Sequence, residues 1–334
     1  MRLYLDSNVY SYILETRESR EARALFAATS ATVLSSDTVV LEAARIPDRE
    51  QRLARMAAIR CVATRRISPP FAFRQAMEVL AEMRRCRPEW LEPVPATRTI
   101  ERILAVGERN WKRLRNDVLF DPAVGLPEYL NAAGSSGAEY LRRQREFRQI
   151  RLNSRDVAFQ AIDPEFQPYL EPFSQPERYW RLNSAGIWAA ALKGAPHMSD
   201  YRDFLEPFLR RISDVSAWLR FWYVDVNADA MPLGRLHSAA EYYQPSRPVT
   251  HGNILDAHHA IHLADCDRLL TCDHDLFKVL LLIRAEFPAT VFGQPVLVRR
   301  RPQYSAVEAI REALRDANCG GLTPCSTGLA APAG

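Results

Sequence analysis

The feature that most constrains the fold is a pair of short apolar segments, far apart in the chain, that each lead into an aspartate. RLYLD ends at Asp6, and RLLTC, residues 268–272, is followed by Asp273. Each segment is short and β-prone, so each predicts a buried strand. Ligands of open α/β sheets bind beyond the carboxyl ends of the strands. Two aspartates at such ends therefore meet at one crevice if their strands are neighbours.

Strands and helices alternate in the first part of the chain. A helical pattern with salt-bridge spacing runs from about residue 11 to 28, and ATVLSS, residues 31–36, predicts the next strand. Asp37 is a good capping residue for a helix that carries Glu42. IRCVAT, residues 59–64, predicts a third strand. This alternation predicts an α/β fold with a mostly parallel sheet.

The middle of the chain, from about residue 70 to 235, has the pattern of amphipathic helices separated by prolines. We interpret it as a helical insertion. The aromatic segment RFWYVDV, residues 220–226, also suits a strand, so its assignment stays open. A last strand is expected in QPVLVRR at 294–300, followed by a helix at about 306–318 and a disordered tail. The expected organisation is a discontinuous core at 1–85 and 236–300, a helical insertion at 86–235, and a C-terminal helix and tail at 301–334.

Composition narrows the class of protein. The 334 residues are 47% hydrophobic and 25% charged, as in ordinary globular proteins. No apolar stretch approaches the roughly 20 residues that span a bilayer, and no secretory signal is recognisable, so we expect a cytoplasmic protein. The six cysteines lack zinc-site spacing and are expected to be reduced thiols. A net charge of +4 gives only mild support to a nucleic-acid partner.

Four carboxylates carry the chemical argument: Asp6, Glu42, Asp256 and Asp273. If they gather at one crevice, they repel one another and raise each other's pKa values unless a cation neutralises them. Mg²⁺ or Mn²⁺ is the natural choice, because hard ions prefer carboxylate oxygen and water. Such an ion can orient a water, lower its pKa and stabilise charge on a phosphodiester. The pattern therefore favours metal-assisted hydrolysis.

The same residues resemble the motifs of the PIN-domain family. LYLDSNVY resembles its opening strand, where an Asp is followed closely by Ser, Thr or Asn. TVVLEAAR, with Glu42, resembles the second motif, in which a Glu follows the second strand. LDAHHAIHLADCDRLLTCDHDLF resembles the third and fourth motifs together. The resemblance covers about the first 85 residues and roughly residues 245 to 300.

The resemblance implies a three-layer α/β/α sandwich and Mg²⁺- or Mn²⁺-dependent endoribonuclease activity on RNA. It places the acidic roles on Asp6, Glu42, Asp256 and Asp273, with Asp275 as an auxiliary acid. Three polar residues would position carboxylates or water, namely Ser7, Asn8 and Thr271. The long helical segment departs from the small PIN toxins of toxin–antitoxin pairs, so the toxin role does not carry over. An inhibitory protein partner and a homodimer stay open.

Each acidic residue also has a structural alternative. Asp6 could be only a helix N-cap, and a Glu early in a helix, such as Glu42, is favoured by the helix dipole alone. Asp256 could cap its helix, and Asp273 with Asp275 could cap the next one. An apolar strand that runs straight into Asp-Ser-Asn favours the functional interpretation of Asp6, and we favour the site for Asp256 and Asp273 too.

Other residue groups are weaker candidates. His258, His259 and His262 have plausible zinc spacing, but no HExxH motif or cysteine pair accompanies them. We expect His259 to face the pocket and His262 to be a polar helix residue. The clustered tryptophans and Tyr223 are expected in the core of the helical insertion. Three arginine groups are candidate phosphate contacts: Arg84, Arg85 and Arg87; Arg142, Arg143, Arg145, Arg148 and Arg151; and Arg299, Arg300 and Arg301.

The working hypothesis is a metal-dependent endoribonuclease. One alternative is an inactive PIN-like module that binds nucleic acid or protein without cutting. Another is a flap-type DNA nuclease, which shares the carboxylate chemistry. A phosphatase of the haloacid-dehalogenase type needs a second Asp two residues after the first, and the chain has Asn8 there.

Overall fold

The computed structural model describes residues 1–124, 142, 145, 176–195, 199–210, 212, 214–244, 253–287, 292–301 and 304–319. Within these residues, five strands form one sheet in the order β3-β2-β1-β4-β5, and every pairing is parallel. The strands are β1 (Arg2–Leu5), β2 (Thr32–Ser35), β3 (Arg65–Arg66), β4 (Arg268–Thr271) and β5 (Gln294–Leu297). The predicted parallel α/β fold is confirmed.

Strand β1 lies at the centre of the sheet, between β2 and β4. Leu3 pairs with Val33 on one side and with Arg268 on the other. Just past the strand, the Asp6 N–H donates to the Leu270 carbonyl at 3.0 Å. The two apolar segments that lead into aspartates are therefore neighbouring strands, although more than 260 residues separate their paired positions.

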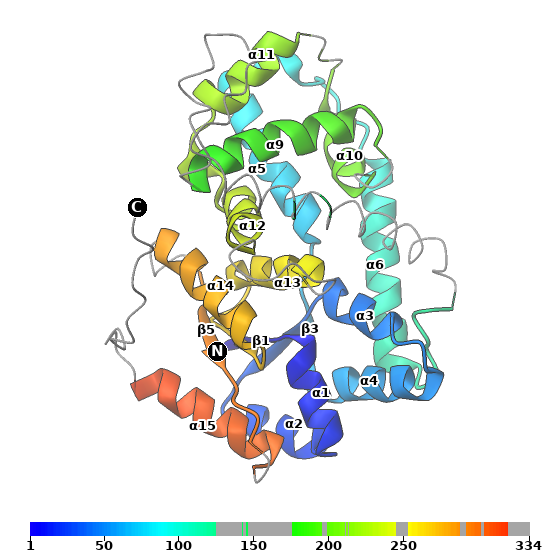
Figure 1. The fold of residues 1–334 in the computed structure, drawn as a ribbon. Coiled ribbons are helices and arrows are strands. Elements are labelled where there is room, and N and C mark those ends of the chain that lie inside the picture. Colours follow the sequence, from blue (N-terminus) through cyan, green and yellow to red (C-terminus); the bar gives the residue numbers. More distant parts are fainter. Residues whose placement is uncertain are drawn as a thin grey trace.

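Helices cover both faces of the sheet (Figure 1). Because parallel crossovers are right-handed, the helices between β1 and β3 lie on one face and the helix between β4 and β5 lies on the other. The first group comprises α1 (Ser7–Glu15), α2 (Ser19–Ala28), α3 (Asp37–Ala44) and α4 (Arg49–Val62), and α15 (Ala306–Cys319) packs against α1 and α2. The second face carries α14 (His274–Glu286), beside α13 (Asn253–Ala260) and the 3₁₀ turn η8 (Ile261–Ala264). This is a three-layer arrangement, with the helix expected at 306–318 in place.

Side-chain caps set where several of these helices begin. Asp6 accepts backbone N–H groups at the start of α1, Ser36 does so for α3, and Asp48 for α4. Asp273 caps α14 in the same way. Each cap satisfies N–H groups that have no partner inside the helix. Strand-to-helix turns therefore fix the polar residues at the carboxyl edge of the sheet.

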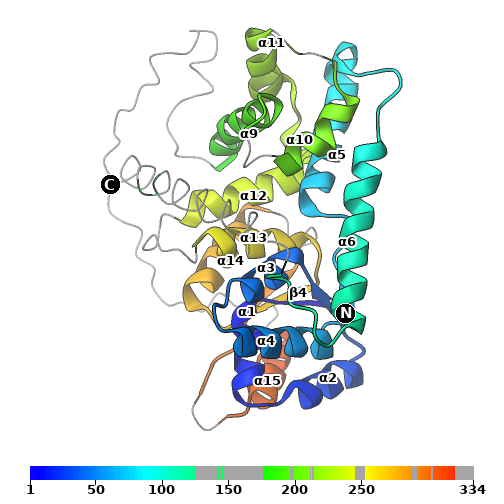
Figure 2. The same ribbon diagram turned by 90° about the vertical axis from the view of Figure 1, so that its right-hand side faces the viewer.

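A second region, helical in its described residues, is inserted between β3 and β4 (Figure 2). Its helices are α5 (Phe71–Cys86), α6 (Arg98–Asn116), α9 (Pro176–Leu192), α10 (Ser199–Leu205), α11 (Val215–Arg220) and α12 (Pro232–Tyr243). It has its own hydrophobic cluster, which contains Trp180, Trp188 and Trp222 and is separate from the cluster around the sheet. The predicted helical insertion and its aromatic core are confirmed. The exact division at residues 86 and 235 stays a prediction.

Two predictions about local structure in the first 64 residues are wrong. IRCVAT at 59–64 is not a strand but the end of α4 and the residues after it, and the edge strand β3 follows at Arg65–Arg66. Met56, Ile59 and Val62 are buried together because they recur at helical spacing on one face of α4. The single helix expected at 11–28 is two, α1 and α2, separated by a turn in which Arg17 has a φ of 60°.

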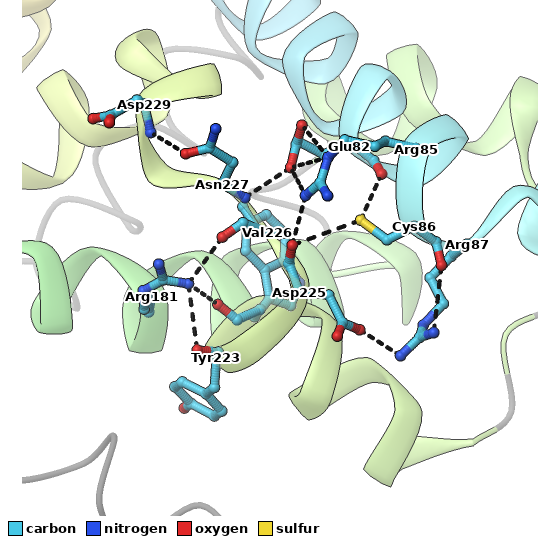
Figure 3. Close-up of polar contacts among 11 residues, drawn as sticks. Glu82, Arg85, Cys86, Arg87, Arg181, Tyr223, Asp225, Val226, Asn227 and Asp229 are labelled. Atoms are coloured by element: carbon cyan, nitrogen blue, oxygen red, sulfur yellow. Dashed lines mark hydrogen bonds and ion pairs between the residues drawn. The ribbon is translucent and has the colours of Figure 1, made fainter.

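The aromatic segment at 220–226 is also not a strand. Phe221–Asp225 forms a π-helical turn that continues α11. Figure 3 shows what holds it: the Arg181 guanidinium donates to the Trp222 carbonyl at 2.9 Å and also to the Tyr223 and Val226 carbonyls. Arg85 donates to the Asp225 carbonyl. Side chains from two other helices thus satisfy backbone groups that a regular helix end leaves open.

Several expectations concern residues outside the described part, including Arg143, Arg148, Arg151 and the tail beyond residue 319. The four described cysteine side chains, Cys61, Cys86, Cys266 and Cys272, are free thiols, as expected. In the described residues, no helix is both long and apolar enough to cross a membrane.

Candidate functional site

Asp6 lies at the carboxyl end of the central strand, with only 1% of its surface exposed. Its Oδ1 accepts the N–H groups of Asn8 at 2.8 Å and Val9 at 3.1 Å. Its Oδ2 accepts the hydroxyl of Thr271, from the end of β4, at 2.5 Å. The capping alternative for Asp6 is therefore real, but it accounts for one oxygen only. The other oxygen joins the ends of two strands that are distant in the sequence.

Glu42 enters the same edge from α3 and bonds to His259 of α13. The Glu42 Oε2 lies 2.9 Å from His259 Nε2, and His259 Nδ1 lies 2.7 Å from the hydroxyl of Tyr4. That hydroxyl is 2.9 Å from Ser36 Oγ, the cap of α3. A polar chain therefore runs from Glu42 through His259 and Tyr4 to Ser36, so His259 lies at this edge of the sheet. Its orientation toward a pocket stays a prediction.

The pKa values of both His259 and Asp6 are raised at this edge, for different reasons. Burial alone would lower the pKa of His259, but the charge and hydrogen bond of Glu42, with the charges of Asp6 and Asp256, raise it to about 9. Both ring nitrogens then donate, one to Glu42 and one to Tyr4. Burial raises the pKa of Asp6 to about 6, opposed by the His259 charge and the Thr271 hydrogen bond. The His259 cation thus stabilises carboxylates that burial disfavours.

The remaining predicted acids lie at other positions around this edge. Asp256 is in the first turn of α13, and its charge acts on His259. The Asp273 carboxylate is directed into its own helix, because Oδ1 accepts the N–H groups of Asp275 and Leu276. Its connection to Asp6 runs through the backbone, since the Asp273 N–H donates to Thr271 Oγ1 at 2.9 Å. Asp275 is half-exposed and pairs with Lys278.

The polar residues after Asp6 contribute mainly through their backbone. Asn8 is exposed, and its N–H binds Asp6. Ser7 is half-buried, and its carbonyl accepts a guanidinium N–H from Arg55 at 2.9 Å. Thr271 is the predicted polar residue that contacts a carboxylate directly.

Arg55 of α4 is a site residue that the sequence did not reveal. Besides its bond to Ser7, its charge interacts with those of Glu42 and Asp6, and burial lowers its pKa. Its Nε is buried without a hydrogen-bond partner in the described structure. Nothing in the arginine-rich sequence of α4 distinguishes this residue from its neighbours, because its position is set by how α4 packs on α1. It places a cation beside the acidic edge.

A second polar chain reaches the site from the helical region. Arg74 of α5 forms two bonds to Asp265, at 2.5 and 3.0 Å, and Asp265 accepts from His262 Nδ1 at 2.8 Å. The His262 ring lies against the Tyr4 ring, with centroids 4.5 Å apart. Burial lowers the pKa of His262, so it is neutral and not a second cation. Arg74 of the helical region therefore supports Tyr4, which hydrogen-bonds to His259, through Asp265 and His262.

The predicted metal-binding carboxylates do not gather into one cluster in the described residues. In the described part of the chain, no group of three or more His, Cys, Asp or Glu side chains is arranged to hold a metal ion. This finding gives no support to the zinc alternative either. Asp6 and Glu42 do interact electrostatically at one edge. Mg²⁺ is commonly held by one or two carboxylates, with waters and substrate phosphates completing its shell. Binding by all four predicted acids stays a prediction.

Most described members of the three arginine groups are engaged in the structure. Arg85 pairs with Glu82 and Arg87 with Asp225 in the helical region. Arg300 pairs with Glu15 and donates to the Asn8 carbonyl, and Arg301 pairs with Glu312. These pairs leave little charge free for phosphate.

Comparison with known proteins adds no relative. No protein-family model, no curated protein and no solved structure matches this chain. Interpretation of the site therefore depends on its own geometry and chemistry.

Proposed function

We propose that the chain is a Mg²⁺- or Mn²⁺-dependent ribonuclease of the PIN-domain type. One observation carries the proposal: Asp6, with its pKa raised by burial, lies at the carboxyl end of the central strand and interacts with Glu42 and the His259 cation. A buried carboxylate with a perturbed pKa and a specific charge partner is a candidate for a functional site. The carboxyl edge of a parallel sheet is also where ligands of such folds bind.

In this proposal, Asp6 and Glu42 would hold the ion together with water and a substrate phosphate. A bound divalent ion supplies two things there: it lowers the pKa of a water and stabilises negative charge on the phosphodiester. The sequence motifs around Asp6, Glu42 and Asp256 support the same assignment, and they give RNA as the expected substrate.

The chain's own residues have positioning and charge-balancing roles. Thr271 holds one oxygen of Asp6 in place, which leaves the carboxylate a single orientation. His259 orients Glu42 through their hydrogen bond, and Tyr4 fixes the His259 ring. Arg55 is suited to attract a phosphate, since its charge faces the same edge.

The test is cleavage of a labelled single-stranded RNA with Mg²⁺, with Mn²⁺ and with EDTA. The wild type should cut only with a divalent ion, and Asp6→Asn should lower the rate at least about 1000-fold. Asp267→Asn is the matched control, because Asp267 is an exposed aspartate that pairs with Arg2 and is not part of the site. Cleavage by Asp6→Asn at the wild-type rate would refute the proposal.

A second candidate is a PIN-like module that binds RNA without cutting it. The lack of a three-donor group in the described residues favours this candidate. It predicts RNA binding without cleavage, and no Mn²⁺-dependent rise in melting temperature. A branched DNA substrate in parallel assays tests the flap-type alternative.

A further inference from the structure

Helix α6 connects the two hydrophobic clusters of the molecule. Ile100, near its start, belongs to the cluster of the helical region, and Ile103 packs against that cluster. Leu114, near its end, belongs to the cluster around the sheet, and Trp111 packs against it. Figures 1 and 2 show α6 running along one side of the molecule from α10 toward α4. One rigid helix therefore spans both regions, with its apolar face turned inward.

The opposite face of α6 carries an exposed row of cations, which we call the α6 basic stripe. At 100° per residue its members fall within about one third of the helix circumference. From first to last it extends about 22 Å at 1.5 Å per residue. The members are Arg98, Arg102, Arg109, Lys112 and Arg113, all exposed.

These charges are available to a partner, unlike those of many other arginines in the described residues. Within the described residues, none of the five forms an ion pair, and Arg113 only lies over the Phe120 ring at 4.8 Å. The acidic residues of α6 lie beside the stripe and not in it: Glu108 pairs with Arg66, and Glu101 accepts from Thr97. A row of unpaired cations on one helix face is what a repeated anionic partner recognises.

Arg66 links α6 to α3, the helix that carries Glu42. This buried arginine at the edge strand pairs with Glu108 of α6 and with Asp37, the first residue of α3, which also carries Glu42. Gly107 makes the contact possible, since a Cβ there would lie 2.7 Å from the Arg66 guanidinium. The two ion pairs of Arg66 thus connect the middle of α6 to α3, which carries Glu42.

We propose that the α6 basic stripe binds the phosphate backbone of a single-stranded RNA and leads it toward the Asp6 edge. The identity of the nucleic acid rests on the proposed function. A membrane surface fits less well, because an interfacial helix inserts its apolar face and that of α6 is packed against the protein.

The experiment compares Arg102→Gln/Arg109→Gln/Lys112→Gln with a control of equal charge loss, Arg20→Gln/Arg23→Gln/Arg311→Gln. The control arginines are exposed on α2 and α15, at the other end of the sheet region. Binding of a labelled single-stranded RNA is measured in EDTA between about 50 and 200 mM salt. We expect the α6 variant to lose at least about 10-fold in affinity and its salt slope to fall by about 2, near 0.7 per lost phosphate contact. The control variant should change the affinity and the salt slope far less.

The outcomes separate this inference from the proposed function. Equal losses in both variants, no loss in the α6 variant, or no RNA binding by the wild type each overturn the inference. So does tighter binding of the wild type to anionic vesicles than to RNA, with the same dependence on α6. Wild-type binding that depends on α6 but comes without cleavage refutes the nuclease and leaves the inference standing. Should the triple variant lose its circular-dichroism signal, the three single variants give the same test, with about threefold losses expected from each.

Discussion

Glu82 in the helical region and Asp6 at the edge of the sheet are both buried, but their pKa values shift in opposite directions. In the helical region, Glu82 accepts from the Arg85 guanidinium and from the Asn227 N–H, and Asp225 pairs with Arg87 (Figure 3). Burial opposes ionisation of Glu82, but these donors outweigh it and lower its pKa. The charged side chains there hydrogen-bond to backbone groups and lie opposite side chains of the other charge. That is how structural ion-pair networks are built.

At the carboxyl edge of the sheet, burial outweighs the donors to Asp6 and raises its pKa. Among the described residues, Asp6 has no arginine or lysine within ion-pair distance, and burial raises its pKa to about 6. A carboxylate kept ionised there near neutral pH lowers the stability of the fold. The network of Figure 3 therefore stabilises the fold through paired charges, whereas the Asp6 carboxylate at the sheet edge is offset only in part, by the His259 charge and the Thr271 hydrogen bond.

Packing should dominate the stability of the helical region. Trp222 is completely buried in its cluster, so Trp222→Ala should lower the free energy of unfolding by about 3 to 5 kcal/mol. Trp111→Ala is the control, because that tryptophan is only partly buried. Urea denaturation gives both values. A larger loss for Trp111→Ala would contradict the assignment of Trp222 to a core.

Glu78 is an exception within the helical region, because its pKa is raised, as that of Asp6 is at the sheet edge. It accepts the N–H groups of Leu233 and Gly234 at the start of α12, and burial raises its pKa to about 7. The folded state then holds its proton more tightly than the unfolded state, whose pKa is near 4.5. Stability from this group is therefore full below about pH 4.5 and falls as pH rises to about 7.

The expected loss is up to about 3 kcal/mol, at 1.36 kcal/mol per pKa unit. Urea denaturation at about pH 5 and pH 8 gives the free energy of unfolding of the wild type and of Glu78→Gln. The change between the two pH values is then compared between the two proteins. The wild type should lose more stability than the variant over this range. Parallel pH profiles of the two proteins would show that Glu78 is not the titrating group.

Removing the charge of Glu82 should destabilise the fold by about 1 to 3 kcal/mol at pH 7. Glu82→Gln weakens charge-assisted hydrogen bonds to Arg85 and Asn227 in a mostly buried place. Glu89→Gln, at an exposed position with no ion pair in the described structure, is the control and should be nearly neutral. Because the folded pKa of Glu82 is lowered, the wild-type advantage should disappear as pH falls below that pKa.

The smallest effect on stability is expected at the residue that matters most for the proposed chemistry. Asp6→Asn keeps an oxygen for the N–H groups of Asn8 and Val9 and removes a buried charge. The free energy of unfolding at pH 7 should change by less than about 1 kcal/mol. If this variant is less stable than Glu82→Gln, the contrast between the two regions is lost.

The sequence predicted much of the fold because its patterns are local. Short apolar segments marked β1, β2, β4 and β5, the first three leading into a helix cap, and proline-separated amphipathic helices marked the insertion. The errors have physical causes. The β-branched residues of 59–64 suggested a strand, yet Ile59 and Val62 continue the buried face of a helix. The two-residue strand β3 is made of arginines, and the π-helical turn depends on Arg85 and Arg181 from distant helices.

The site was predictable in its main carboxylates but not in their partners. Asp6 follows from its strand, and its neighbour Thr271 follows once β1 and β4 pair. The engagement of Glu42 by His259 requires α3 and α13 to pack together, which sequence periodicity does not specify. Arg55 was missed for the same reason. The α6 basic stripe had a detectable signal, a helix with cations on one face and apolar residues on the other, that we did not single out.

The pairing of β1 with β4 sets the order in which the fold can assemble during synthesis. Strand β1 is synthesised before the helical insertion, but its partner β4 begins only at Arg268. Chains interrupted anywhere in the helical insertion hold Asp6 without Thr271 or His259, so they lack an assembled site. The helical insertion, built from contacts closer in sequence, can form its core while translation continues. A nascent chain would therefore complete the central sheet, and the Asp6 edge with it, only after the helical insertion has been synthesised.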